Sequence, residues 1–433
     1  MPAIKQFLFL CLLALASSAL WAGPKVESWQ TRGGATVMYV HAPDLPMVDI
    51  RVVFDAGSAR DGDAPGLATL TNSLLTEGAG PWDADALAER LEDVGAQISN
   101  DSLRDMAYVA IRTLTDPAVL EVSLDTLEKI LSAPRFEEDD VERQRQLMLI
   151  ALSKQQENPG SIASLNFYAS MYGDHPYGHD PLGNEASVKA LTREDVVGFH
   201  ATRYVAANAV LAIVGDLDRE AARKVAERLM ANLPAGEHAP PLPPVPVAGG
   251  RDVQVAFDAT QTHIRVGATG MARLDPDYFP LYVGNHVLGG NGLVSILSQE
   301  VREARGLSYS VYSYFLPMRV PGPFLMGAQT RNDRSGEALR VMRETLEHFL
   351  EHGPTEEQLD AAKRNLTGGF PLRVASNSKI VEYIAMMGFY GYPLDYLDTF
   401  VDQVDAVTRA DVLRAFRGRI NPDDLVLVTV GGS

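Results

Sequence analysis

The sequence predicts an α+β protein built from two tandem homologous domains, each a mostly antiparallel sheet with helices packed on one face. Strand-like and helix-like stretches interleave without the regular rhythm of parallel crossovers. The second half of the chain also repeats segments of the first half. The chain has 433 residues, of which 46% are hydrophobic, and this is enough for two domains with sizeable cores.

The duplication is clearest near the end of each half. The run 192–196, Thr-Arg-Glu-Asp-Val, returns at 408–412 as Thr-Arg-Ala-Asp-Val. In both copies the Thr is placed to cap a helix, an apolar strand follows, and a glycine ends that strand. The copies also begin alike, with strand-like runs at 50–52 and 264–266. A repeat unit this long indicates two similar domains rather than a solenoid.

Periodicity places the same kinds of element in each half. In the first half it predicts a strand over 50–55, a helix over 67–75, a strand over 106–114, helices over 118–132 and 141–155, and a strand over 209–214. In the second half it predicts a strand from His263, helices from Leu281 and Ser295, a strand from Leu307, helices from Gly336 and Glu356, and a strand over 425–430.

The predicted domains are 23–234 and 251–433, joined by a linker over 235–250. The linker contains five prolines: Pro240, Pro241, Pro243, Pro244 and Pro246. This composition indicates a semi-rigid, exposed segment. Such a linker either lets two halves close around a ligand or acts as a spacer, and composition does not distinguish the two.

Residues 1–22 have the features of a secretory signal peptide. Lys5 supplies the positive charge, Phe7 to Leu20 is almost wholly apolar, and Ala22 precedes a plausible cleavage point. The apolar run is short for a spanning helix, so we expect no stable membrane anchor after cleavage. The only cysteine, Cys11, lies in this segment. The mature chain would therefore form no disulfide, which suits a periplasmic (secreted) location.

The charge balance argues against nucleic acid as a partner. The chain has 56 acidic and 38 basic residues, with a formal net charge of -18. Such a surface repels phosphate backbones. The acidic residues are spread along the chain, which is typical of a solvated surface.

The segment 54–61, followed by Gly-Leu-Ala at 66–68, resembles the opening of the zinc peptidases related to insulinase, pitrilysin and the mitochondrial processing peptidase, peptidase family M16. The segments 174–178 and 301–314 extend the resemblance over nearly the whole mature chain. In active members an inverted zinc motif, His-x-x-Glu-His, follows the Gly-Leu-Ala. Its two histidines bind zinc from one helix face and its Glu activates water. The resemblance also implies a peptide or an unfolded protein as substrate.

This chain departs from the family at the metal site. The motif positions are Thr69, Asn72 and Ser73. Hydroxyls are poor neutral zinc ligands, and an amide cannot take a proton from water. The family's third ligand, a glutamate, would fall at Ile150 or Ala151, where there is no carboxylate. The resemblance therefore implies a degenerate zinc site with no catalytic residue, metal or cofactor in this chain.

A literal match to the inverted motif occurs elsewhere, at His348, Glu351 and His352. It lies in the second half, on a helix that a Gly-Pro pair ends at once. Pairing the two copies places this helix opposite 126–131, which carries no ligands. We interpret the match as an exposed face of a scaffold helix. A zinc metallopeptidase in its own right that uses these residues is the alternative.

Arg302 and Tyr309 match a pair that active members use to bind substrate, seven residues apart in the second half. The setting also matches, because a helix end, a Gly-Leu turn and a strand-like run surround them. An Arg fork bonds a peptide carbonyl, and a Tyr hydroxyl donates to the oxyanion of the tetrahedral intermediate. The alternative is structural: Arg302 would complement its helix C-terminus and Tyr309 would pack across strands.

In some bacterial members of the family, one subunit carries the zinc motif and another carries the Arg/Tyr pair. The sequence fits the second kind. The resemblance therefore implies an inactive, substrate-binding subunit of a heteromeric periplasmic zinc peptidase, with zinc only in the partner subunit of the same family. A peptide-binding pseudoenzyme without a peptidase partner is a further alternative.

Overall fold

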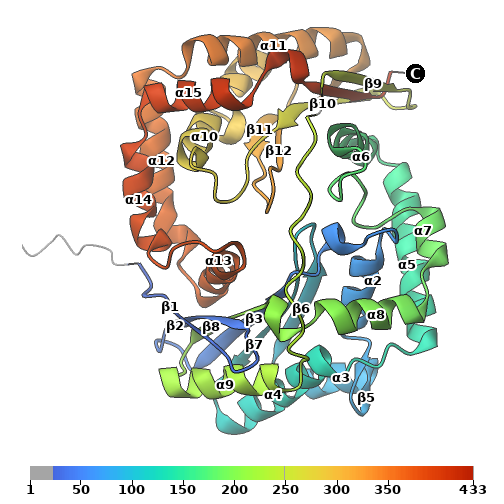
Figure 1. Cartoon of the computed structure of the whole chain (residues 1–433). Helices are drawn as coiled ribbons and strands as arrows, with labels where there is room; N and C mark the ends of the chain where they lie inside the picture. Colours follow the sequence, from blue (N-terminus) through green and yellow to red (C-terminus); the bar gives the residue numbers. More distant parts are fainter. Residues whose placement is uncertain (1–22, 248, 433) are drawn as a thin grey trace, which may run out of the picture.

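The computed structural model describes residues 23–247 and 249–432, so the expected signal peptide and Cys11 lie outside the described residues. The chain forms two similar α+β halves, drawn at the bottom and the top of Figure 1. This confirms the predicted fold class. Within the described part of the chain, no helix is long and apolar enough to cross a membrane.

The first half contains a six-stranded sheet in the order β1-β2-β8-β3-β7-β6. Its strands are β1 (Glu27–Gln30), β2 (Thr36–His41), β3 (Met47–Phe54), β6 (Gln97–Ser102), β7 (Ala107–Leu114) and β8 (Ala209–Gly215). Its helices are α2 (Leu67–Leu74), α3 (Ala84–Glu92), α4 (Pro117–Ser132), α5 (Glu138–Gln156), α6 (Pro159–Tyr172), α7 (Glu185–Ala190), α8 (Arg193–Arg203) and α9 (Arg219–Ala231). The short strands β4 (Gly78–Ala79) and β5 (Trp82–Asp83) form a separate pair.

The second half contains a five-stranded sheet in the order β11-β12-β10-β13-β9. Its strands are β9 (Arg251–Val255), β10 (Gln261–Thr269), β11 (Val311–Phe315), β12 (Pro323–Arg331) and β13 (Val426–Val430). Its helices are α10 (Tyr278–Asn285), α11 (Ser335–His352), α12 (Glu356–Arg373), α13 (Asn377–Tyr390), α14 (Tyr396–Ala406) and α15 (Arg409–Arg419). Two π-helical turns, η3 (His286–Gly290) and η4 (Ser298–Glu303), lie between α10 and β11.

The duplication inferred from the sequence is present in the structure. The order β2-β8-β3-β7-β6 matches β9-β13-β10-β12-β11, and in each sheet only the pair β2-β8 or β9-β13 is parallel. Thr192 and Thr408 both cap their helices, accepting from the backbone N–H of Asp195 and Asp411, whose carboxylates accept in return. Each helix leads to the strand that a glycine ends.

The largest boundary error in the second half concerns a strand. The strand expected from Leu307 begins at Val311, because residues 307–310 form a loop. Gly306 turns the chain with a φ of 59°, which favours glycine. The Ser308 hydroxyl then lies 2.7 Å from two carbonyl oxygens, those of Ser310 and Gln329, and this holds the loop away from the ladder.

Each sheet has its own helices on one face and a helix from the other half on its second face. Helix α13 of the second half packs on β2, β3 and β8, and helix α6 of the first half packs on β10 and β13 (Figure 1). We refer to α6 and α13 as the crossing helices. The sequence analysis expected helices on one face only. The second covered face explains why every residue of β8 is buried and why the strand is apolar throughout.

Two glycines allow the crossing helices to lie close to the sheets. A Cβ on Gly388 of α13 would lie 2.6 Å from Val210 and 2.7 Å from Met38. A Cβ on Gly267 of β10 would lie 2.8 Å from the ring of Phe167 on α6. Real Cβ atoms do not approach other atoms this closely, so both contacts depend on the missing side chain.

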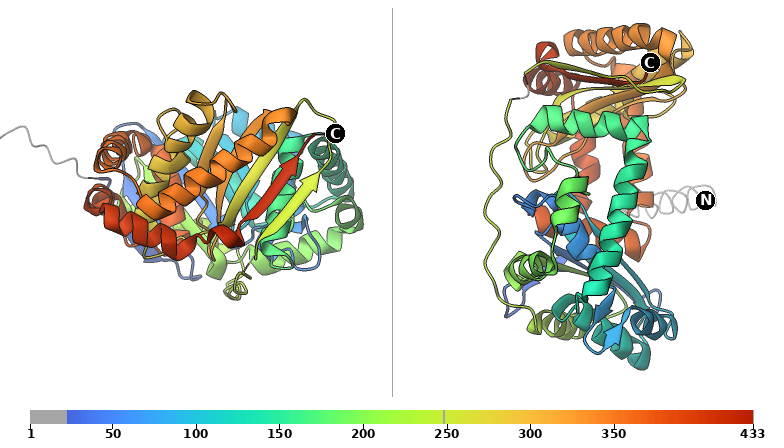
Figure 2. Two further views of the ribbon diagram at one scale, coloured as in Figure 1. Left: turned by 90° about the horizontal axis from the view of Figure 1, so that it is seen from above. Right: turned by 90° about the vertical axis from the view of Figure 1, so that its right-hand side faces the viewer.

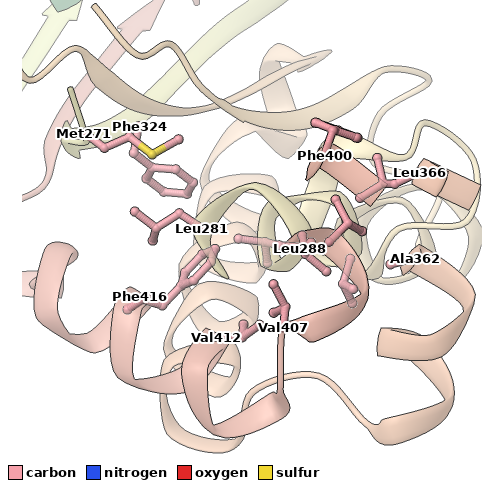
Figure 3. Packing of buried hydrophobic residues seen from close by; sticks show 14 of the residues in the cluster. Met271, Leu281, Leu288, Phe324, Ala362, Leu366, Phe400, Val407, Val412 and Phe416 are labelled. Atoms are coloured by element: carbon pink, nitrogen blue, oxygen red, sulfur yellow. The ribbon is translucent and has the colours of Figure 1, made fainter. Parts of the chain in front are cut away.

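The helices on the outer face of the second sheet close a large apolar core (Figure 3). Phe416 of α15 lies 4.9 Å from Phe349 of α11 between ring centroids, with Phe324 of β12 on the same ring. Phe370 stacks on Phe400 at 4.2 Å. This packing holds α10, η3 and α12 in place.

The Pro-rich segment 235–250 runs along one side of the molecule from one half to the other (Figure 2). The described residues within it form neither helix nor strand. His175 Nε2 lies 3.0 Å from the carbonyl oxygen of Pro243, and Arg60 donates to that of Pro240 at 2.7 Å. The backbone N–H of Ala207 also donates to the Ala235 carbonyl oxygen, and the Ala239 N–H donates to Asn208 Oδ1, so the segment is hydrogen-bonded to the first half at several points.

Asp105 joins the two halves. It lies between β6 and β7 and is 5% exposed. Its carboxylate accepts from Tyr177 of the first half, from the Tyr390 hydroxyl on α13 at 2.8 Å, and from the backbone N–H of Arg319 at 2.7 Å. A buried carboxylate that accepts three hydrogen bonds is satisfied in its charged form, and two of these donors belong to the second half.

We predict that Asp105→Ala lowers the free energy of unfolding by about 2–4 kcal/mol, because the buried Tyr177 hydroxyl and two part-buried donors lose their acceptor. Urea unfolding of the purified chain measures this. Asp101→Ala is the matched control, since Asp101 is exposed and, among the described residues, its side chain accepts only from the N–H of Ser102. Equal stability of the two variants would contradict the role given to Asp105.

Candidate functional site: a degenerate zinc helix and an available Arg/Tyr pair

Helix α2 carries the positions of the expected zinc motif, and a buried carboxylate fixes its start. Asp61 accepts from the backbone N–H of Gly66 and of Ala68, each at 2.8 Å. The His179 Nε2 group lies 3.0 Å from the same carboxylate and donates to it. Burial raises the pKa of Asp61, while the bonds from His179 and the two amides oppose that shift. These contacts hold the first turn of α2 as they would in a helix that presented metal ligands.

The two outer motif positions are occupied by hydroxyls that bond within the protein. Thr69 Oγ1 donates to the carbonyl oxygen of Pro181 at 2.7 Å. Ser73 Oγ donates to the carbonyl oxygen of Leu70, one turn back in the same helix, at 2.9 Å. Both hydrogen atoms are directed at protein carbonyls, and neither side chain has the charge or basicity of a zinc ligand.

Asn72, at the position of the family's catalytic base, lies at the centre of a buried network. It is 1% exposed. Its Nδ2 group donates to the carbonyl oxygen of Tyr108 and to the Tyr204 hydroxyl, each at 3.3 Å, and its Oδ1 accepts from Asn100 at 3.1 Å. Burial raises the pKa of Tyr204, which therefore stays protonated. The sequence analysis identified Asn72 but missed Asn100 and Tyr204, which lie far from it in sequence.

The position expected for the third zinc ligand carries no carboxylate side chain in the structure either. Ile150 lies on α5 and is 51% exposed. In the described part of the chain, no three His, Cys, Asp or Glu side chains are close enough together to hold a metal ion. The residues around α2 thus do not fit zinc, and no reaction step is assigned to a metal in this chain.

The literal match at His348 and His352 lies on the last turns of α11. The two rings stack 4.3 Å apart, and the Glu351 carboxylate lies 3.8 Å from His352 Nδ1. The His352 and Glu351 side chains are 51% and 74% exposed. Gly353 ends the helix with a φ of 67°. The pair lies on a solvent-exposed face, and within the described residues no further ligand joins it.

Arg302 and Tyr309 lie in the second half, on either side of the Gly306 turn. Arg302 is half-buried in the last turn of η4, and its guanidinium has no hydrogen bond or ion pair within the described chain. The neighbouring Arg305, by contrast, pairs with Glu300 at 2.6 Å. Tyr309 lies in the loop before β11 and is 91% exposed. Both polar groups are therefore available to a molecule outside the chain.

Comparison with known proteins agrees with this geometry. Residues 36–185 match the model of Insulinase (Peptidase family M16), and residues 190–366 match that of the Peptidase M16 inactive domain. The crystal structure of a peptidase M16 inactive domain from Pseudomonas fluorescens is 38% identical, with a TM-score of 0.92, over 94% of this chain and 98% of that one. The chain therefore belongs to peptidase family M16.

Curated relatives carry two kinds of name. An uncharacterized zinc protease of Mycobacterium leprae is 28% identical over 381 residues, covering 87% of this chain and 85% of that protein. The non-peptidase homolog YmxG of Helicobacter pylori is 25% identical over 431 residues, covering 99% of this chain and 98% of that protein. Family membership alone does not separate the two kinds. In this chain the motif positions, Thr69, Asn72 and Ser73, lack zinc-binding side chains.

We predict that the purified chain, dialysed against a weak chelator, retains far less than one zinc per chain, because α2 offers no imidazole or carboxylate. Elemental analysis by mass spectrometry measures this. The double variant His348→Ala/His352→Ala should give the same metal content as the unmodified chain. Stoichiometric zinc that disappears in the double variant would instead establish the exposed pair on α11 as a metal site.

Proposed function

We propose that this chain is the non-catalytic, substrate-binding subunit of a heteromeric zinc peptidase. The proposal rests on the contrast between the motif positions on α2 and the Arg302/Tyr309 pair. The motif positions on α2 are filled by Thr69, Asn72 and Ser73, which bond within the protein. The substrate-binding pair is retained, with an unpaired guanidinium on Arg302 and an exposed hydroxyl on Tyr309.

The chemistry is then divided between two chains. A partner of the same family, with an intact zinc motif, supplies the metal and the glutamate that together make the nucleophile. Arg302 of this chain bonds a carbonyl of the peptide near the scissile bond. The Tyr309 hydroxyl donates to the oxygen on which negative charge develops. Each contribution is made by a side chain that the described structure leaves without another role.

The proposed setting is the periplasm, because residues 1–22 have the composition of a secretory signal. The substrate is a peptide or an unfolded protein, since the Arg/Tyr pair recognises main-chain groups rather than a particular side chain. The alternative hypothesis is a peptide-binding pseudoenzyme that acts without a peptidase partner. Copurification from the native host separates the two, because only the first requires a chain with an intact inverted zinc motif in stable association.

We predict that Arg302→Ala and Tyr309→Phe each reduce turnover by the reconstituted complex while leaving assembly intact. Losing one oxyanion donor costs about a hundred- to a thousand-fold in turnover in other enzymes. Tyr309→Phe removes only a hydroxyl, so kcat should fall with little change in KM. Arg302→Ala removes a positioning contact as well, so KM should also rise. Steady-state kinetics, with assembly followed by gel filtration, measures both effects.

Arg305→Ala is the matched control for the arginine. Arg305 lies three residues further along the chain, but it is paired with Glu300 and is not part of the proposed pair. The control should cleave at the rate of the unmodified complex. If Arg302→Ala and Tyr309→Phe assemble normally and also cleave at that rate, the roles assigned to the pair are wrong.

A further inference from the structure

A cavity of about 690 Å³ lies in the second half, between α10, η3, β11 and the C-terminal end of α12. We refer to it as the arginine pocket. Aromatic side chains form part of its walls, Tyr278, Tyr282 and Tyr312 among them. Its lining includes two arginines, Arg273 and Arg373, and no aspartate or glutamate. In a chain with a formal net charge of -18, a concave surface with this lining is a local site of positive charge.

The arginine pocket is the counterpart, in the second half, of the degenerate zinc site. In the first sheet Val109 pairs with both Val52 and Asn100, and in the second sheet Met326 pairs with both Val266 and Ser313. Asn100 and Ser313 are therefore equivalent. Asn72 on α2 bonds to the first, and Asn285 on α10 bonds to the second.

Because Asn72 and Asn285 are equivalent, the same shift along the chain relates their neighbours. It places Tyr282 at the position of Thr69 and His286 at the position of Ser73. Both Tyr282 and His286 line the pocket. The pocket thus occupies the place in which an active member would hold zinc in its first half, but it is lined by donors and positive charge.

Neither arginine is neutralised by a carboxylate. Arg373 Nη1 donates to the Tyr282 hydroxyl at 2.6 Å, and no ion pair of Arg373 or Arg273 is found within the described chain. The guanidinium of Arg273 lies 5.1 Å from the ring centroid of Tyr390. Its Nε atom is buried and has no hydrogen-bond acceptor among the described residues. Because no carboxylate of the described residues pairs with either guanidinium, both keep an uncompensated positive charge that favours an anion.

The tyrosine hydroxyls of the pocket are further donors at neutral pH, whereas the single N–H of His286 is already used within the protein. His286 Nε2 donates to Asn365 Oδ1 at 3.1 Å. Burial lowers the pKa of His286, so the ring stays neutral, and burial raises the pKa of Tyr282 and that of Tyr314, the latter to about 12. The tyrosine hydroxyls therefore keep their protons.

We propose that the arginine pocket binds a carboxylate carried by a peptide, with the apolar residues next to that carboxylate against the tyrosine wall. The volume matches pockets that enclose a ligand of several residues, which is far more than a simple anion requires. Asn285 Nδ2 donates to the carbonyl oxygen of Ser313 at 3.1 Å. This hydrogen bond occupies the middle of the outer edge of β11. The peptide is therefore held by its charged end rather than added as a strand.

This inference goes beyond the proposed function. Neither Arg302 nor Tyr309 lines the arginine pocket. Binding is measurable on the purified chain alone. A negative binding result would not contradict the proposed role beside a zinc subunit. A negative result in the kinetic test would not contradict ligand binding in the arginine pocket.

The test uses the peptide Ser-Ala-Val-Ala-Phe, labelled at its N-terminus with fluorescein, and follows fluorescence anisotropy. Three forms are compared: a free C-terminal carboxylate, a C-terminal amide, and an amide in which the second residue is Glu. Binding of the free acid alone assigns the pocket to a peptide C-terminus. Binding of the Glu-containing amide as well assigns it to carboxylates in general. In either case added salt should weaken binding.

Arg373→Gln and Arg273→Gln should each weaken binding by about ten- to a hundred-fold, as expected for loss of a hydrogen bond to a charged group. Because Arg273 is packed against Tyr390, His286→Glu provides a second test that leaves both arginines in place and adds a negative charge. It should abolish binding of the free acid. Arg364→Gln is the matched control, since Arg364 lies on the same helix as Arg373 but is exposed and outside the pocket.

Three results would overturn the inference: no binding of any form, equal binding of the acid and the plain amide, or binding that survives both Arg373→Gln and His286→Glu.

Discussion

The reciprocal packing of the crossing helices is the constraint on which the rest of the structure depends. Each half supplies one helix to the inner face of the other half's sheet, α6 in one direction and α13 in the other. Separation of the halves would expose apolar faces of both sheets to water, at a cost that scales with the area uncovered. The carboxylate of Asp105 adds hydrogen bonds across the same junction. The two halves thus form one body, and the Pro-rich segment spans it rather than hinging two free domains.

The contacts around α2 show how the fold holds this helix in place although its motif positions lack zinc-binding side chains. The position of α2 depends on Asp61 at its first turn and on the packing of its buried leucines, not on a metal. At the point where a base and a water molecule would lie, Asn72 instead satisfies the polar groups of its neighbours. Because the fold is duplicated, an equivalent position exists in each half. In the first half that position is a buried amide network, and in the second half it is a pocket with two arginines.

The sequence predicted most of the fold because its signals are local. Caps at Thr192 and Thr408, apolar alternation in the strands and the repeated order of elements each depend on a few neighbouring residues. The crossing helices left no such signal. Helix α6 is apolar around much of its circumference, so its sequence does not specify which sheet it covers. The strand expected from Leu307 starts later for a related reason: the Ser308 hydroxyl lies 2.7 Å from the carbonyl oxygen of Gln329, 21 residues further along the chain. Asn100, Arg273 and Arg373 were missed because their roles depend on contacts across long sequence separations.

The exposure of Tyr309 has a consequence for the proposed division of labour. A hydroxyl stabilises a developing oxyanion strongly only where water is excluded, because the same hydrogen bond is much weaker in a high dielectric. At 91% exposure, Tyr309 in the isolated chain is surrounded by solvent. Its contribution therefore requires that a second protein surface cover it together with the peptide. A zinc-bearing partner would thus supply two things at once, the metal that makes the nucleophile and the enclosure in which Arg302 and Tyr309 become effective. On this proposal the isolated chain holds the substrate-binding half of the site in an incomplete form, and association with the partner completes it.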